Sequence, residues 1–210
     1  IFNREAVKKL MPERRDKEHE FGTNPCSEIC LRSSETCNLS EVVLHPTDTV
    51  DDVSHKIGLA TILGTIQSAL TDFRYVRPIW RKNAEEERLL GVSFTGVFDC
   101  PVVLNATPDQ LEAWKGSAIA MNNIWAKKMG INPSAAITCI KPSGTVSQLT
   151  GVAGSGLHPS YSKYYIRRIR QDRKDPLNQA LIDAGIQYED DPYNKEAIVF
   201  SFPMKAPAKS

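Results

Sequence analysis

Two cysteines and one carboxylate lie close together near the start of the chain, in a pattern that suits radical or redox chemistry. Cys26 is followed by Glu28, and Cys37 comes shortly afterwards. Pro25 restricts the backbone directly before the first thiol and stiffens the turn that presents it. A cysteine that only packs in a core needs neither a nearby acid nor a second thiol, whereas a redox site uses both. Segment 24–37 is therefore the first candidate site.

Two simpler interpretations of this segment remain open. In the first, the cysteines are ordinary buried thiols and Glu28 is a solvated turn residue. In the second, four side chains of suitable type bind zinc, namely Cys26, Cys30, Cys37 and His45. Structural zinc sites usually combine close cysteine pairs with a longer loop between them, and the cysteines here are strung out singly. We therefore predict no metal site. Cys30, Cys100 and Cys139 are expected to be packing thiols.

A second candidate site follows the apolar run 135–140. Small hydroxyl residues surround a glycine there, and such a loop offers N–H groups and hydroxyls that can bind phosphate without a strong positive field. Taken alone, the pattern is weak evidence, because a similar sequence often serves only as a helix cap. The candidate phosphate-binding residues are Pro142, Ser143, Gly144, Thr145, Val146 and Ser147.

The segments NPCSEI and CNLSEVVL resemble the active-site loop of ribonucleotide reductases. The spacing of Cys26 and Cys37 and the later segment PSGT are most similar to the adenosylcobalamin-dependent group, which stretches 151–159 and 164–168 also resemble. The resemblance implies that Cys26 carries the thiyl radical and that Glu28 is the general base on the 3′-hydroxyl of the substrate. It also implies that Asn24 hydrogen-bonds the substrate, that Cys37 belongs to the reducing thiol pair, and that residues 142–147 bind substrate phosphate.

The same resemblance implies a fold and an activity. The expected fold is α/β, with residues 1–210 forming part of a single catalytic domain, a ten-stranded α/β barrel in which a finger loop carries the radical cysteine. The expected activity is radical-based reduction of ribonucleotides, and ribonucleoside triphosphates are the expected substrates. Adenosylcobalamin is the implied cofactor, although no residue can be assigned to it, and a thioredoxin-like protein is the implied reductant. Two alternatives stay open, namely the large subunit of an iron- or manganese-dependent reductase and a non-catalytic nucleotide-binding fragment.

Composition excludes some other classes of function. Lys and Arg total 26 against 25 Asp and Glu, so the formal charge of +1 gives no general attraction for nucleic acid or an anionic membrane. No apolar run is long enough to span a membrane, and the N-terminus does not resemble a signal peptide. An odd number of cysteines without such a signal argues against a disulfide scaffold, so we expect a cytoplasmic protein. The first residue is Ile1 rather than methionine, and we expect the chain to be a fragment.

Strand and helix patterns alternate along the chain, which predicts α/β architecture with a largely parallel sheet or barrel. Residues 1–23 are rich in charge and predict a surface helix. A helix capped by Thr49 or Asp51 is expected to reach Phe73, with Ile57, Ala60, Leu63, Ile66 and Leu70 on its apolar face. A second helix is expected from Thr107 to Gly130, because both end signals are present. The remaining predictions are strands at 41–44, 90–97, 135–140, 164–170 and 197–202, and a helix at 175–185.

Overall fold

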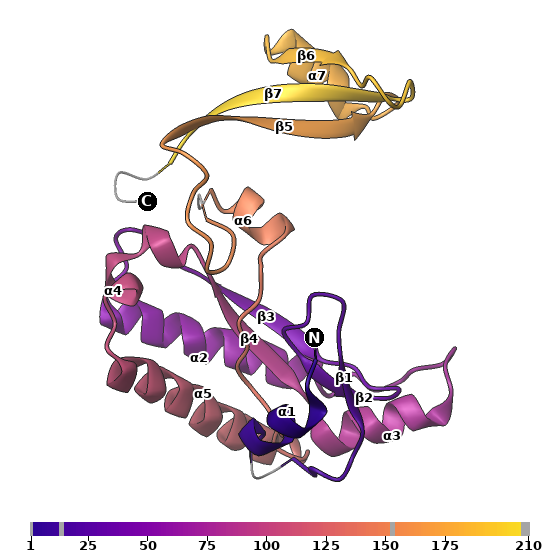
Figure 1. Cartoon of the computed structure of the whole chain (residues 1–210), viewed down its shortest axis with the longest axis vertical. Coiled ribbons are helices and arrows are strands. Elements are labelled where there is room, and N and C mark those ends of the chain that lie inside the picture. Colours follow the sequence, from indigo (N-terminus) through magenta and orange to yellow (C-terminus); the bar gives the residue numbers. More distant parts are fainter. Residues whose placement is uncertain (1, 13–14, 152–153, 207–210) are drawn as a thin grey trace. The chain divides into compact units, whose positions relative to one another are not determined.

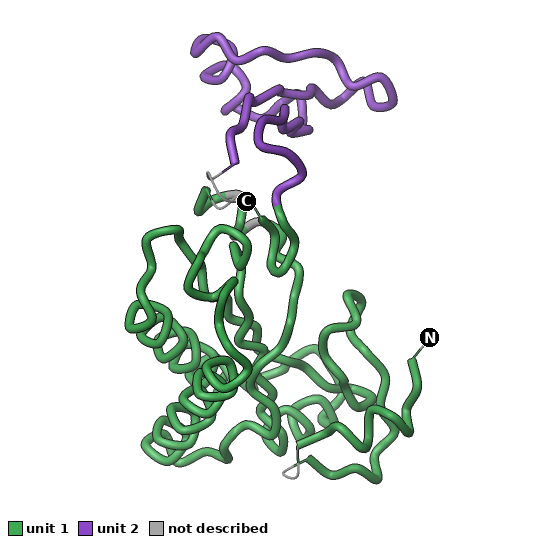
Figure 2. Tube along the Cα trace, turned by 60° about the vertical axis from the view of Figure 1, so that its left-hand side comes forward, with its two compact units in different colours: residues 1–159 green, residues 160–210 purple. Residues whose placement is uncertain are grey.

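The computed structural model describes residues 2–12, 15–151 and 154–206. The chain divides into two compact units, residues 1–159 and 160–210 (Figure 2). Val152 and Ala153, which belong to stretch 151–159, lie outside the described residues. The elements of the first unit are α1 (Arg4–Leu10), β1 (Phe21–Thr23), β2 (Cys30–Arg32), β3 (Asn38–Val43), α2 (Val50–Gln67), α3 (Pro78–Glu87), β4 (Leu90–Thr95), a 3₁₀ turn (Val97–Asp99), α4 (Pro101–Leu104), α5 (Pro108–Met129) and α6 (Thr145–Leu149). Those of the second are β5 (Tyr164–Asp172), α7 (Leu177–Asp183), β6 (Gln187–Asp190) and β7 (Ala197–Lys205).

A parallel sheet covered by two helices forms the core of the first unit. Strands β3 and β4 pair in parallel from Asn38 opposite Leu90 to Val43 opposite Thr95. Residues 136–139 continue the sheet beyond β4 through a parallel bridge between Val92 and Thr138 and a 3.0 Å hydrogen bond from the Cys139 N–H to the Val92 carbonyl. Helices α2 and α5 lie side by side along this sheet (Figure 1).

The alternation of side chains along these strands gives the sheet two different faces. The face toward the helices is apolar, since Val42 and Leu90 pack against Val53, Ile57 and Trp114 in one buried cluster. On the opposite face, the Cys139 sulfur lies 3.0 Å from the position that a Cβ at Gly91 would take. We call this opposite face the thiol face; its residues are Leu39, Glu41, Gly91, Ser93 and Cys139.

The two long helices begin where their capping residues predict. The Thr49 side chain accepts from the Asp52 N–H in a capping box, and Thr107 caps α5 with Pro108 at its first position. Helix α5 ends at Gly130, which adopts φ 66°. The predicted N-termini of both helices and the predicted C-terminus of α5 are therefore confirmed. They could be predicted because capping signals are local in sequence.

The predicted apolar face of α2 is only partly correct. Ile57 and Ala60 are buried, but Leu63 is 64% exposed and the helix ends at Gln67, before Leu70. Small residues face the sheet in the second half of α2 instead. A Cβ at Gly64 would lie 3.4 Å from the Leu90 side chain, which is van der Waals contact, so the helix packs closely on β4 at this residue.

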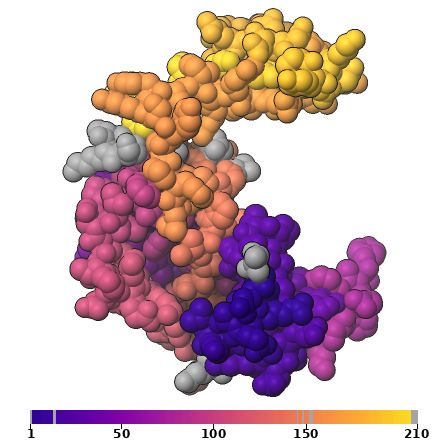
Figure 3. Space-filling model, viewed as in Figure 1, coloured from indigo at the N-terminus to yellow at the C-terminus, as the bar shows by residue number. Residues whose placement is uncertain are grey.

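The N-terminal segment differs most from its prediction. The surface helix expected over residues 1–23 is confirmed only for α1, and β1 pairs with β2 as an antiparallel hairpin. Arg15 lies in the segment between α1 and β1. It is only 4% exposed, because it is paired with the buried carboxylates of Glu35 and Glu87. Figure 3 shows the N-terminal residues, in indigo, as a continuous patch on one face of this unit. Helix α3 was not predicted, and β3 starts at Asn38 rather than at Glu41.

The second unit is an antiparallel sheet in the order β5-β7-β6, with α7 in the connection between β5 and β6. The predicted strands and helix of this region are confirmed, and β5 and β7 are longer than expected. Strand β6 was not predicted, since all four of its residues are exposed and polar or aromatic. The expectation of parallel pairing therefore describes residues 38–139 and not residues 164–205.

Candidate functional site

A hairpin tip presents the first candidate residues. Strands β1 and β2 pair as far as Thr23 opposite Cys30, which leaves residues 24–29 as the connecting loop. The Asn24 N–H donates to the Ile29 carbonyl at 3.1 Å, and the Asn24 side-chain oxygen accepts from the Ile29 N–H at 3.1 Å. Ser27 adopts φ 63° at the tightest point of the turn. Asn24 thus closes the loop from which Cys26 projects.

Cys26 and Glu28 differ sharply in their surroundings. Cys26 is exposed at the tip of the hairpin. Glu28 lines a cavity of about 280 Å³ together with Arg15, Leu90 and Thr138. Both carboxylate oxygens of Glu28 are buried, and neither has a hydrogen-bond partner among the described residues. A buried acceptor without a donor is costly, so this carboxylate is available to a group that enters the cavity.

Cys37 and Cys139 are half-buried, and the charge of the same carboxylate, Glu28, acts on both thiols. Burial raises the pKa of Cys37 to about 12, and the nearby Cys139 and Glu28 act in the same direction. Burial likewise raises the pKa of Cys139 to about 12, again with a contribution from Glu28. Both sulfurs therefore remain protonated thiols near neutral pH, which suits hydrogen donation better than attack as a thiolate. Cys100 is fully buried, as expected of a packing thiol.

Cys139 was expected to be inert packing, and sequence reasoning did not connect it with the site. The structure places it on the thiol face, within electrostatic range of both Cys37 and Glu28. Gly91 makes this possible, because a side chain there would meet the Leu39 methyl at 2.5 Å and the Cys139 sulfur at 3.0 Å. The signal in the sequence was the glycine inside a strand pattern.

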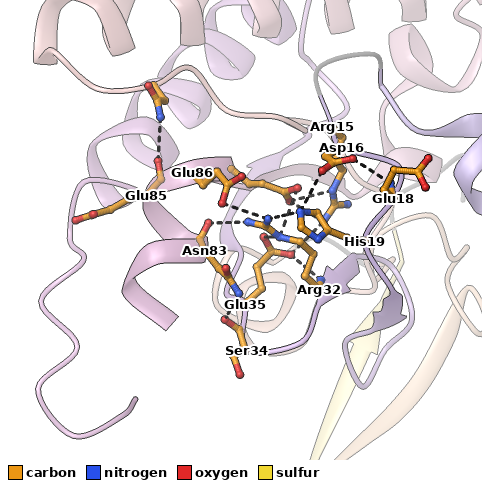
Figure 4. Close-up of polar contacts among 12 residues, drawn as sticks. Arg15, Asp16, Glu18, His19, Arg32, Ser34, Glu35, Asn83, Glu85 and Glu86 are labelled. Atoms are coloured by element: carbon orange, nitrogen blue, oxygen red, sulfur yellow. Dashed lines mark hydrogen bonds and ion pairs between the residues drawn. The ribbon is translucent and has the colours of Figure 1, made fainter. Parts of the chain in front are cut away.

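A buried ion cluster fixes the segment between the hairpin and Cys37 (Figure 4). Arg15 donates to Glu87 at 2.9 Å and to Glu35 at 3.1 Å, and Arg32 donates from its side chain to Glu35 at 3.1 Å. The Arg32 backbone N–H also donates to Glu35 at 2.7 Å. His19 lies 2.9 Å from the Arg32 guanidinium. The two arginines donate hydrogen bonds to both buried carboxyl groups, so burial of the whole cluster is tolerated, whereas removal of an arginine would leave a buried acid without its donor.

The candidate phosphate loop uses its hydroxyls internally. The Ser143 hydroxyl accepts from the Ser147 N–H at 3.1 Å, and the Ser147 hydroxyl donates to the Gly144 carbonyl at 3.1 Å. Thr145 is the first residue of α6, while Pro142 and Val146 are exposed. A Cβ at Gly144 would meet nothing within 4 Å, so the space beside this glycine is open.

Two further features are absent from the described residues. These residues contain no group of three or more His, Cys, Asp or Glu side chains placed to hold a metal ion, and so Cys26, Cys30, Cys37 and His45 form no such group. Across the same residues, no helix is both long enough and apolar enough to cross a membrane.

Comparison with known proteins gives a consistent result. The chain is 32% identical to the adenosylcobalamin-dependent ribonucleoside-triphosphate reductase of Lactobacillus acidophilus and 30% identical to that of Levilactobacillus brevis; each alignment covers 88% of this chain and 28% of the reductase. It also resembles a crystal structure of a B12-dependent (class II) ribonucleotide reductase, with a TM-score of 0.71, 27% identity, and coverage of 90% of this chain and 30% of that one. No family model matches the chain.

These comparisons confirm the resemblance to ribonucleotide reductases, and to their adenosylcobalamin-dependent group, that the sequence motifs indicate. The chain has the fold of a segment of such an enzyme. It spans about 28% of the length of the curated relatives that it matches.

Proposed function

We propose that this chain is the segment of an adenosylcobalamin-dependent ribonucleotide reductase that carries the radical cysteine, and that the complete protein reduces ribonucleoside triphosphates to 2′-deoxyribonucleotides. One observation supports this above all others. An exposed thiol at a hairpin tip, Cys26, is two residues from a carboxylate, Glu28, whose buried oxygens have no partner among the described residues. A thiol that can take a hydrogen atom and a carboxylate that can take a hydroxyl proton are the two groups that radical-based reduction of a ribonucleotide uses.

The chemistry assigns a separate task to each residue. As a thiyl radical, Cys26 takes the 3′ hydrogen atom of the substrate and becomes a thiol. Glu28 accepts the 3′-hydroxyl proton, which favours departure of the 2′-hydroxyl as water. Cys37 and a second cysteine together supply two electrons and two protons, and they end as a disulfide. Cys26 then returns its hydrogen atom to the 3′ carbon and is again a radical, and Glu28 returns its proton to the 3′ oxygen.

The surroundings of each residue fit these tasks. The raised pKa of Cys37 keeps its sulfur protonated, as a hydrogen donor must be. Asn24 closes the hairpin loop through its side-chain oxygen, which leaves its N–H₂ group to bind the substrate. Adenosylcobalamin, when bound, would supply the oxidising equivalent for Cys26. The exposure of that thiol fits an external oxidant, and we assign no residue of this chain to the cofactor.

Residues 142–147 are proposed to hold the substrate phosphates mainly through backbone N–H groups. The hydroxyls of Ser143 and Ser147 already have partners within the loop, so they contribute by fixing its shape. The open space beside Gly144 is the expected position of phosphate oxygens. A thioredoxin-like protein is the proposed reductant, and the hairpin is the proposed finger loop of a ten-stranded barrel to which residues 1–210 contribute as one catalytic domain.

The test uses the complete enzyme that contains this chain, with Cys26→Ser compared with Cys30→Ser. Cys30 is the first residue of β2 and has no proposed role, so it is a matched control within the same hairpin. We expect Cys26→Ser to abolish deoxynucleotide formation while nucleotide binding and fold persist, and Cys30→Ser to retain turnover. Substantial product from purified Cys26→Ser would exclude Cys26 as the radical site.

A further inference from the structure

A buried threonine at the end of strand β4 helps to attach residues 154–156, which adjoin the phosphate loop, to the sheet. Thr95 is fully buried, and its hydroxyl oxygen accepts from the Gly156 N–H at 2.9 Å. The same hydroxyl donates to the Gly154 carbonyl at 3.4 Å. The Asp99 carboxylate accepts from the Gly154 N–H at 3.3 Å, and the Val97 N–H donates to the Gly156 carbonyl at 3.4 Å. Residues 154–156 are thereby held on the β4 end of the sheet.

Residues 154–156 in turn contact the start of the phosphate loop. The Ser155 hydroxyl donates to the Ser143 carbonyl. Gly156 adopts φ 60°, and a Cβ there would lie 2.4 Å from the Lys141 carbonyl oxygen and 3.2 Å from the Pro142 Cα. Such close approach of two backbones needs glycine and fixes the position of one segment against the other. A continuous path of hydrogen bonds and backbone packing thus runs from Thr95 through Ser155 to Ser143.

From this path we infer that Thr95 is a positioning residue for the substrate phosphates. It does not touch the substrate; it sets the distance between the phosphate loop and strand β4, whose Gly91 and Ser93 lie on the thiol face. This inference rests on the proposed function, because it takes residues 142–147 as the phosphate site. Its consequence is that the Thr95 hydroxyl affects how well the phosphates are bound when the sugar is at Cys26 and Glu28.

Two substitutions at Thr95 separate the hydroxyl from the shape of the side chain. Thr95→Val keeps the volume and leaves the Gly156 N–H without its acceptor, whereas Thr95→Ser keeps the acceptor. In the complete enzyme we expect Thr95→Val to raise the KM for the ribonucleotide about five- to tenfold with kcat changed less than about twofold. Thr95→Ser should restore the KM to within about twofold of the original value. Ser155→Ala, which breaks the same path at a partly buried position, should raise the KM in the same direction.

Hydrogen exchange in the 210-residue chain gives a readout that does not depend on turnover. Thr95→Val should accelerate exchange at residues 154–156 and also at 143–147, while exchange in α2 stays unchanged. Faster exchange in α2 as well would mean general destabilisation and would overturn the inference. Unchanged exchange at 143–147, or accelerated exchange there with an unchanged KM, would overturn it too. If the unsubstituted complete enzyme reduced no ribonucleotide, the proposed function would be refuted instead. The exchange data do not depend on that result, so the two failures can be told apart.

Discussion

The side-chain amide of Asn122, in helix α5, is buried and makes three hydrogen bonds. It is 1% exposed, and its N–H₂ group donates to the hydroxyls of Thr65 and Ser134, each at 2.9 Å. Its oxygen accepts from the Ser134 N–H at 2.8 Å. The amide therefore joins α5 to α2 and to the segment that leads into residues 136–139 of the sheet.

Asn122→Ala should destabilise the chain by about 2–4 kcal/mol. The largest part is the buried Ser134 N–H, which loses its acceptor at a cost of about 1–3 kcal/mol. Loss of the two bonds to hydroxyls adds about 1–2 kcal/mol, reduced because the Thr65 hydroxyl still donates to the Thr61 carbonyl at 2.7 Å. The better helix propensity of alanine returns roughly 0.5 kcal/mol.

The adjacent Asn123 provides a matched control, because it is exposed on the same helix. Asn123→Ala removes the same atoms, and we expect it to be neutral or to stabilise by roughly 0.5 kcal/mol. Urea unfolding of both variants, followed by circular dichroism at 25 °C, measures the difference. Exchange at the Cys139 N–H should also accelerate in Asn122→Ala, since Ser134 precedes the segment that pairs with β4. A difference below about 1 kcal/mol between the two variants would refute the claim that this network stabilises the attachment of α5 to α2 and to the segment before residues 136–139.

Four other outcomes follow from the site. Glu28→Gln should lower turnover of the complete enzyme about a hundredfold to ten-thousandfold with nucleotide binding unchanged, and turnover within about twofold of the original would assign the proton to another group. Burial, together with the neighbouring Glu87, raises the pKa of Glu35 from 4.5 to about 7. The folded chain therefore holds a proton that the unfolded chain releases, and this stabilisation is complete below about pH 4.5 and lost as pH rises through about 7. Urea unfolding should show a fall on the order of 1–3 kcal/mol between pH 5 and 8 that Glu35→Gln lacks; an equal fall in both proteins would contradict this. Gly91→Ala should lower the free energy of unfolding by about 1–3 kcal/mol, because the new methyl group overlaps the Leu39 and Cys139 side chains of the thiol face. An unchanged urea midpoint would show that these side chains move aside without cost. Gly144→Val should weaken ribonucleotide binding while the urea midpoint stays constant, because no other atom of the described chain lies near that position; retained affinity would exclude the loop as the phosphate site.

The sequence predicted features whose signals are local. Thr49, Thr107 and Gly130 mark helix ends by interactions within one turn, so their positions could be derived before any fold was known. The face that α2 buries depends instead on how closely Gly64 approaches Leu90, which is a property of two elements in contact. Hydrophobicity alone therefore predicted the buried residues Ile57 and Ala60 of α2, but not the buried residues that follow them in this helix.

The candidate site divides in the same way. Cys26, Glu28 and Cys37 lie in one short stretch, and their roles remain predictions drawn from the resemblance. The proximity of Cys139 to Glu28 and Cys37 depends on a parallel pairing with β4 that no short motif encodes. Arg15 shows the converse problem, because its charged neighbours in sequence suggest a solvated surface, whereas the partners that bury it, Glu35 and Glu87, come from distant positions.

Two carboxylates of the same region, Glu35 and Glu28, differ in how many hydrogen-bond donors surround them. Glu35 receives the Arg32 backbone N–H and the guanidinium groups of Arg15 and Arg32. Glu28 is separated from it by a few residues of chain, and both of its oxygens are buried without a partner among the described residues. A fold that can supply this many donors to one buried acid has the means to satisfy another. An unsatisfied carboxylate costs about 1–3 kcal/mol or more, and this cost is offset when a hydroxyl group of a bound molecule donates to it. The unequal distribution of donors is therefore an argument that Glu28 binds a ligand. This argument does not depend on the sequence motif in which Glu28 occurs.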